Sequence, residues 1–137
     1  MIVLDTNVLS EPLKTKPAPK VVEWLDNQSA ETLFLTAISR AELRFGVLKL
    51  PDGKRKNALA AQIERVLDLF KDRTLDFDAA AADKLAEIAV HCMTIGKRAV
   101  APDAYIAACA AARDFAVATR DVGHFEHTGV RVINPWK

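Results

Sequence analysis

Five short apolar runs recur along the chain, and longer stretches with helical spacing separate them. The runs occupy residues 1–4, 33–36, 74–77, 115–119 and 130–133. They show no regular alternation of polar and apolar positions, which is the pattern of strands that are buried on both faces. We therefore expect a parallel sheet that is covered by helices on both sides.

The stretches between these runs place apolar residues three or four positions apart. This period predicts helices over residues 21–25, 59–70 and 85–95, and an alanine-rich helix over residues 101–113. Gly96 follows the third of these helices and can end it as a C-terminal cap. Strands and helices thus alternate, and the order predicts a three-layer α/β sandwich.

Length and composition narrow the class of protein. The chain has 137 residues, half of them hydrophobic, which is enough for one domain with its own core. The net charge of +1 means that binding to nucleic acid needs a local basic patch. Cys92 and Cys109 are expected to be free, buried thiols. No apolar stretch reaches the ~18 residues of a membrane span and no signal peptide is evident, so we expect a cytoplasmic protein.

Four acidic residues, Asp5, Glu42, Asp103 and Asp121, lie where a strand ends or a helix begins. Each has a plain structural explanation. Asp5 and Asp121 follow strands, where an aspartate commonly caps a helix or closes a turn. Asp103 lies in a first helical turn, where the helix dipole favours negative charge. Glu42 follows Ser39 at the spacing of a capping box, although it shares a stripe with apolar residues if its helix begins earlier.

The fold class gives the four acids a second interpretation. Ligands of such folds bind outside the carboxyl ends of the strands, and all four acids would meet at that edge. Carboxylates gathered there raise one another's pKa unless a cation lies among them. An all-oxygen cluster selects Mg²⁺ or Mn²⁺, ions that activate water and neutralise charge on a phosphodiester. We therefore expect Asp5 to be a metal ligand.

Four motifs follow one another at the separations of a known family: IVLDTNVLSE, TAISRAELRFGV, APDAYIAACAAA and VATRDVGHF. Together they resemble the PIN-domain ribonucleases, and most closely the VapC-type toxins of bacterial toxin–antitoxin pairs in their FitB-like branch. The resemblance extends to the final VINPW. It implies one PIN-like domain over residues 1–137, with a central parallel sheet of order 3-2-1-4-5.

The resemblance also implies a metal-dependent endoribonuclease and assigns its site. Mg²⁺ or Mn²⁺ would be held by Asp5, Glu42, Asp103 and Asp121, supported by the hydroxyls of Thr6 and Thr119. Many members read T-x-N-x-x-D-F where this chain reads TRDVGHF, so His124 stands in the place of a later aspartate. That difference leaves the fourth ligand and a second metal open. A surface or packing role is the ordinary interpretation of His124, and the two histidines of HFEH lack a third ligand for a transition metal.

Basic residues provide candidates for phosphate contacts and partners. Arg40, Arg44 and Arg120 adjoin the acidic motifs and are the preferred candidates for substrate binding, whereas residues 53–56 are typical of a solvated face. The resemblance further implies a cognate VapB-like antitoxin that docks on the helical pair over residues 42–70. It also implies a homodimer or a toxin–antitoxin hetero-oligomer, in which the antitoxin alone contacts operator DNA.

Two other classes of function stay open. A non-catalytic PIN-fold partner in an antitoxin-mediated DNA-binding complex would keep the fold, but it would have no need of four acids. A phosphotransfer domain would use Asp5 as its nucleophile. Such domains usually carry a second acid two residues later, where this chain has Asn7.

Overall fold

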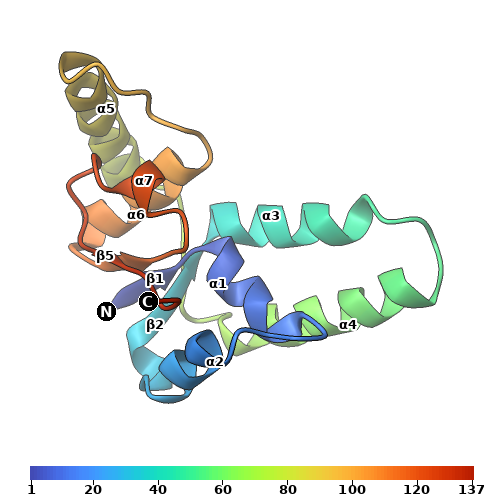
Figure 1. Ribbon diagram of the computed structural model, residues 1–137. Coiled ribbons are helices and arrows are strands. Elements are labelled where there is room, and N and C mark those ends of the chain that lie inside the picture. The colour runs from blue at the N-terminus through green and yellow to red at the C-terminus, as the bar shows by residue number, and fades with distance from the viewer.

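The computed structural model describes all 137 residues, and its five strands form one parallel sheet (Figure 1). The strands are β1 (Ile2–Leu4), β2 (Leu33–Thr36), β3 (Thr74–Leu75), β4 (Ala116–Ala118) and β5 (Val132–Ile133). Their order, β3-β2-β1-β4-β5, confirms the prediction. The edge strands β3 and β5 keep only two of the four predicted residues each, and each pairs with a neighbour on one side. The first strand therefore lies in the centre, between β2 and β4.

Seven α-helices connect the strands. They are α1 (Thr6–Ser10), α2 (Pro19–Asp26), α3 (Ala37–Leu48), α4 (Lys54–Leu69), α5 (Ala79–Thr94), α6 (Asp103–Arg113) and α7 (Val122–Phe125), with short 3-10 turns at Glu11–Leu13 and Ala30–Thr32. The helices expected from the apolar spacing are confirmed. Helix α7 was not predicted, because four residues are too few to show a helical period. Gly96, at φ +68°, follows the end of α5 in the left-handed conformation that glycine adopts most easily.

One face of the sheet packs against α5, α6 and α7. Its core contains Val3 and Val117 from the sheet, Ile88 and Ile106 from the helices, and Phe125 from α7. Helix α6 presents buried alanines to the sheet, so its backbone can approach the strands closely. The predicted free thiols of Cys92 and Cys109 are confirmed, and both are buried in this layer.

The opposite face packs against α1, α2, α3 and α4. Leu4 and Leu35 from the sheet meet Val8, Leu43 and Leu67 from the helices. Successive strand residues point to opposite faces, which is why Val3 and Leu4 belong to different cores. Helices on both faces of a parallel sheet confirm the three-layer α/β sandwich. Helices α3 and α4 lie side by side and extend away from the sheet (Figure 1).

None of the helices combines the length with the apolar character that crossing a bilayer requires.

Phe125 anchors α7, a helix too short to be stable alone. Its ring is fully buried among the residues of the α5–α6 layer. We expect Phe125→Ala to lower the free energy of unfolding by about 3–5 kcal/mol, because it leaves a cavity in a packed core. Urea denaturation followed by circular dichroism measures this loss.

The matched control is Phe45→Ala on α3, where the side chain is 65% exposed. This change should alter the free energy of unfolding by no more than about 0.5 kcal/mol. Equal losses in the two variants would show that Phe125 does not anchor α7.

Candidate metal centre

Asp5 lies at the carboxyl end of the central strand, and only 3% of it is exposed. Its backbone N–H donates to the Ala118 carbonyl of β4, which fixes the residue between two strands. One carboxylate oxygen accepts from the Thr6 N–H at 2.8 Å, so Asp5 is also the cap of α1. The other oxygen accepts from the buried Thr119 hydroxyl at 2.7 Å. A cap needs only the first of these contacts, so the second indicates a further role.

Glu42 reaches the same edge from α3. This helix begins at Ala37, and its cap is Thr36, whose hydroxyl accepts from the Ser39 N–H at 3.1 Å. The capping box between Ser39 and Glu42 is therefore wrong, because the helix starts earlier than that interpretation requires. Glu42 instead accepts a hydrogen bond from the Thr6 hydroxyl at 2.7 Å.

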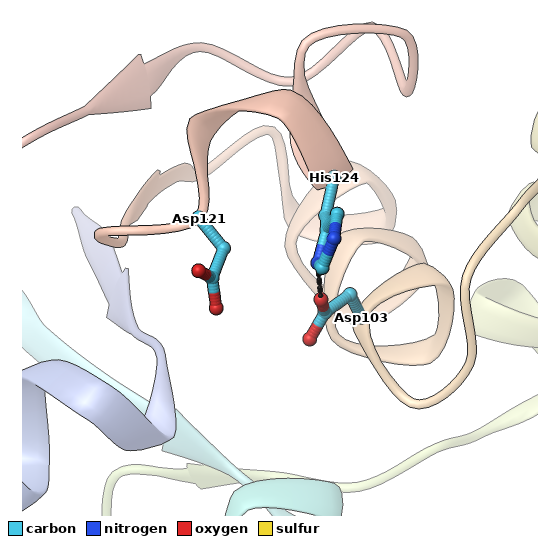
Figure 2. A group of neighbouring side chains, drawn as sticks. All are labelled: Asp103, Asp121 and His124. Atoms are coloured by element: carbon cyan, nitrogen blue, oxygen red, sulfur yellow. Dashed lines mark hydrogen bonds and ion pairs between the residues drawn. The ribbon is translucent and has the colours of Figure 1, made fainter.

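Asp103 and Asp121 enter from the other layer, together with His124 (Figure 2). Asp103 is the first residue of α6, and Asp121 precedes α7 in the turn after β4. The His124 Nδ1 lies 2.6 Å from an Asp103 carboxylate oxygen. Asp103, Asp121 and His124 each offer one ligand atom, and these atoms lie within 4.8 Å of one another. His124 is exposed, as the surface interpretation expects, but its ring also contacts an acid of the site.

Asn7 joins the two halves of the site, a role that the sequence did not reveal. Its amide donates to Asp121 at 3.1 Å, and its carbonyl oxygen accepts from the Arg120 N–H at 3.3 Å. Thr119 adds a second link, because its oxygen accepts from the Asp121 N–H at 3.0 Å. In the sequence, the only sign of this role is that Asn7 is the third of three polar residues that directly follow the first apolar run.

The charges of the acids act on one another. Burial, with contributions from Asp103 and Glu42, raises the pKa of Asp5 to about 6. Burial also raises the pKa of Glu42 and that of Asp103, while the hydrogen bonds from Thr6 and His124 respectively oppose the rise. Asp121 raises the pKa of Asp103 in turn. Asp5, Glu42 and Asp103 thus influence one another, Asp121 acts on Asp103, and we call these four acids the acid cluster.

The three predicted arginines lie differently. Arg120 adjoins the acid cluster through Asn7, and its guanidinium lies over the Trp136 ring, 5.3 Å from the centroid. Arg44 forms an ion pair with Glu64 of α4. Arg40 is exposed on α3 and forms no ion pair. Substrate contact by any of the three stays a prediction.

The acid cluster is rich in the oxygen donors that a hard divalent cation prefers, and three of its groups bear a raised pKa. The ligand atoms within 4.8 Å of one another belong to Asp103, Asp121 and His124, whereas Asp5 and Glu42 are linked to Asp103 electrostatically. A cation among them would reverse that rise, because it stabilises the ionised form. Carboxylates that only cap helices would not need to lie close to one another.

Comparisons with known proteins agree with this fold and site. The model of the PIN domain family matches residues 2–130. Toxin FitB of Neisseria gonorrhoeae is 48% identical, over 99% of each chain. VapC ribonuclease Y4jK of Sinorhizobium fredii is 46% identical, over 100% of this chain and 99% of its own. A solved structure of FitAB bound to the IR36 DNA fragment superposes with a TM-score of 0.96 at 47% identity, over 100% of this chain and 96% of the other.

The chain therefore belongs to the PIN-domain family. Within that family it lies in the branch that contains Toxin FitB. The predicted resemblance is confirmed.

The raised pKa of Asp5 predicts how the metal-free protein responds to pH. A carboxyl whose pKa is higher in the folded state favours folding below its unfolded pKa, and this contribution is lost as pH rises through about 6. At about pH 8 in EDTA, Asp5→Asn should therefore raise the free energy of unfolding by about 1–3 kcal/mol. The gap to the parent should shrink as the pH falls through 6.

Urea denaturation at a series of pH values measures this gap. Asp83→Asn is the matched control, because the exposed Asp83 on α5 lies outside the acid cluster and should change the free energy of unfolding by less than about 0.5 kcal/mol. A metal-free Asp5→Asn protein less stable than its parent at about pH 8 would contradict the prediction.

Proposed function

We propose that this chain is a metal-dependent endoribonuclease toxin of a toxin–antitoxin pair, which hydrolyses RNA phosphodiester bonds. The observation that carries the proposal is the buried Asp5 carboxylate, placed within electrostatic reach of Glu42 and Asp103 at the carboxyl edge of the sheet. The names of the relatives, Toxin FitB and VapC ribonuclease Y4jK, support the same activity.

Asp5, Glu42, Asp103 and Asp121 would hold Mg²⁺ or Mn²⁺. The bound ion would supply activation of water and neutralisation of charge on the phosphodiester. Thr119 and Thr6 keep the Asp5 and Glu42 carboxylates in fixed orientations through hydrogen bonds of 2.7 Å each. Fixed donors need no rearrangement during the reaction, which is the usual advantage of a preorganised site.

His124 positions Asp103 in this proposal. An ionised carboxylate can only accept a hydrogen bond, so the imidazole Nδ1–H donates to Asp103. Ligand orientation by a hydrogen-bonded neighbour commonly accounts for about 10–100-fold in metal affinity. His124 would thus strengthen metal binding indirectly, by orienting Asp103, whereas an additional acidic ligand would bind the metal itself.

Two amide substitutions distinguish the roles of the two ring nitrogen atoms of His124. The amide group that His124→Asn introduces would lie near the place of Nδ1, whereas the longer side chain of His124→Gln reaches the place of Nε2. We expect His124→Asn to keep nearly the parent affinity for Mn²⁺, and His124→Gln and His124→Ala to lose about 10–100-fold by calorimetry. Affinity kept by glutamine and lost by asparagine would show that Nε2 contacts the ion or substrate instead.

Asp5→Asn tests the proposed activity. The purified variant should bind no Mn²⁺ tightly and should cleave RNA at least about 100-fold more slowly, because an amide keeps the shape but not the charge. Asp83→Asn, an exposed aspartate on α5, is the control and should behave as the parent. Cleavage of total RNA and Mn²⁺-dependent melting temperatures are the two measurements.

These measurements also separate the alternatives. A non-catalytic partner would show no melting shift with Mn²⁺ in the parent and no difference between parent and Asp5→Asn. A phosphotransfer domain would form an acid-labile phosphoenzyme on Asp5 instead of cutting RNA. Equal cleavage by the pure parent and Asp5→Asn proteins would overturn the nuclease proposal.

An antitoxin is the proposed partner. A hollow of about 540 Å³ lies beside Glu42, between α1, α3 and α4, and Leu43, Leu59 and Ile63 form part of its wall. A basic side chain inserted past this wall would meet the acid cluster. The structure of FitAB bound to a DNA fragment supports a hetero-oligomer that binds DNA, and we propose that the antitoxin makes the DNA contact.

A further inference from the structure

A second hollow adjoins the acid cluster on the side of Asp121. Its volume is about 620 Å³, within the range of sites that hold small ligands. Arg120, Asp121 and His124 form one wall, and Asn134 and Lys137 from the segment after β5 form another. Because Asp121 and His124 also face Asp103, the hollow opens directly beside the acid cluster.

Two positive charges, Arg120 and Lys137, and one acid, Asp121, line this hollow, and no ion pair joins them. Neither Arg120 nor Lys137 forms an ion pair, and both residues are exposed. Arg120 helps to lower the pKa of Glu11, but the Glu11 carboxylate is paired with Lys14 at 2.8 Å and not with Arg120. The charges of Arg120 and Lys137 are therefore available to a ligand.

An aromatic ring restricts the orientation of the Arg120 side chain. Its guanidinium lies over the Trp136 ring, and its backbone N–H donates to Asn7. The backbone N–H of Trp136 in turn donates to the side-chain oxygen of Asn134 at 3.0 Å, which leaves the side-chain NH2 of Asn134 free to donate. A planar guanidinium with a restricted orientation suits the paired oxygens of a phosphate.

We propose that this hollow binds a backbone phosphate of the RNA strand next to the phosphate that is cleaved. The inference rests on the proposed nuclease function. Arg120 and Lys137 neutralise the phosphate, and Asn134 donates to one of its oxygens. The Asp121 carboxylate, also in the wall, accepts from Asn7 and faces the acid cluster, so the positive side chains are left to meet the strand.

Binding to single-stranded RNA tests the subsite without cleavage. The probe is a fluorescein-labelled oligouridine, and its anisotropy is followed against salt with proteins that all carry Asp5→Asn. Adding Arg120→Gln and Lys137→Gln should weaken binding about tenfold and make the slope of log K against log salt shallower by about 0.7, the value of one phosphate contact. In the active enzyme the same pair should raise KM and leave kcat nearly unchanged.

A matched pair controls for total charge. Arg131→Gln and Lys71→Gln remove the same number of positive charges. Arg131 lies just before β5 and Lys71 lies between α4 and β3, so both are at the amino ends of the strands, away from the acid cluster. This pair should leave the salt slope unchanged. Because Arg120 packs on Trp136, melting temperatures check the fold. Lys137→Gln alone removes no ring contact and should give part of the effect.

The outcomes distinguish a failure of the subsite proposal from a failure of the nuclease proposal. If the parent cuts RNA but adding Arg120→Gln and Lys137→Gln to the Asp5→Asn protein does not weaken binding, the subsite proposal is wrong and the nuclease proposal is kept. If the control pair loses as much affinity, bulk charge explains binding and the subsite is again wrong. If the parent cuts no RNA and the Asp5→Asn protein does not bind the probe, both proposals fall.

Discussion

A buried carboxylate at the end of the central strand is the constraint around which this protein is organised. Asp5 is almost fully covered, yet its hydrogen bonds to Thr6 and Thr119 do not fully offset the loss of solvation, and its pKa rises to about 6. A neutral residue at this position would destabilise the fold less than a buried charge does. Stability is given up at this position, as is common at sites that serve chemistry.

The two helical layers bring different parts of the acid cluster to that edge. Helix α3 carries Glu42 from one layer, and α6, packed closely through small residues, carries Asp103 from the other. Thr6 links Asp5 to Glu42, because its backbone N–H donates to Asp5 and its hydroxyl donates to Glu42. Thr119 links Asp5 to Asp121, because its hydroxyl donates to Asp5 and accepts from the Asp121 N–H. The site is thus fixed by packing of both faces of the sheet, and a change in either core would move a carboxylate.

The two hollows beside the acid cluster differ in chemistry. The one next to Glu42 has leucine and isoleucine in its wall, which suits an amphipathic protein segment. The one next to Asp121 carries unpaired positive charge, which suits a phosphate. An antitoxin and an RNA strand could therefore approach the same carboxylates from different sides, and a partner in the first hollow would need only one side chain at the cluster to oppose the substrate.

Much of this architecture could be predicted from the order of residues. Continuous apolar runs identified the buried parallel strands, and motifs at matching separations identified the family before any contact was known. The acids at strand ends were found because parallel strands finish at one edge. Local rules failed where a helix start was misplaced: Ser39 and Glu42 fit a capping box, but Thr36 caps the helix three residues earlier.

The sequence by itself determined the fold class and the positions of the four acids, because hydrophobic period and strand-end chemistry are local properties. Only the tertiary structure decided that His124 binds Asp103, that Asn7 joins Asp121 to Arg120, and that Arg44 pairs with Glu64. Each of these contacts joins residues 20 or more positions apart. Their meeting depends on how helices are rotated and packed, which no short stretch of residues records.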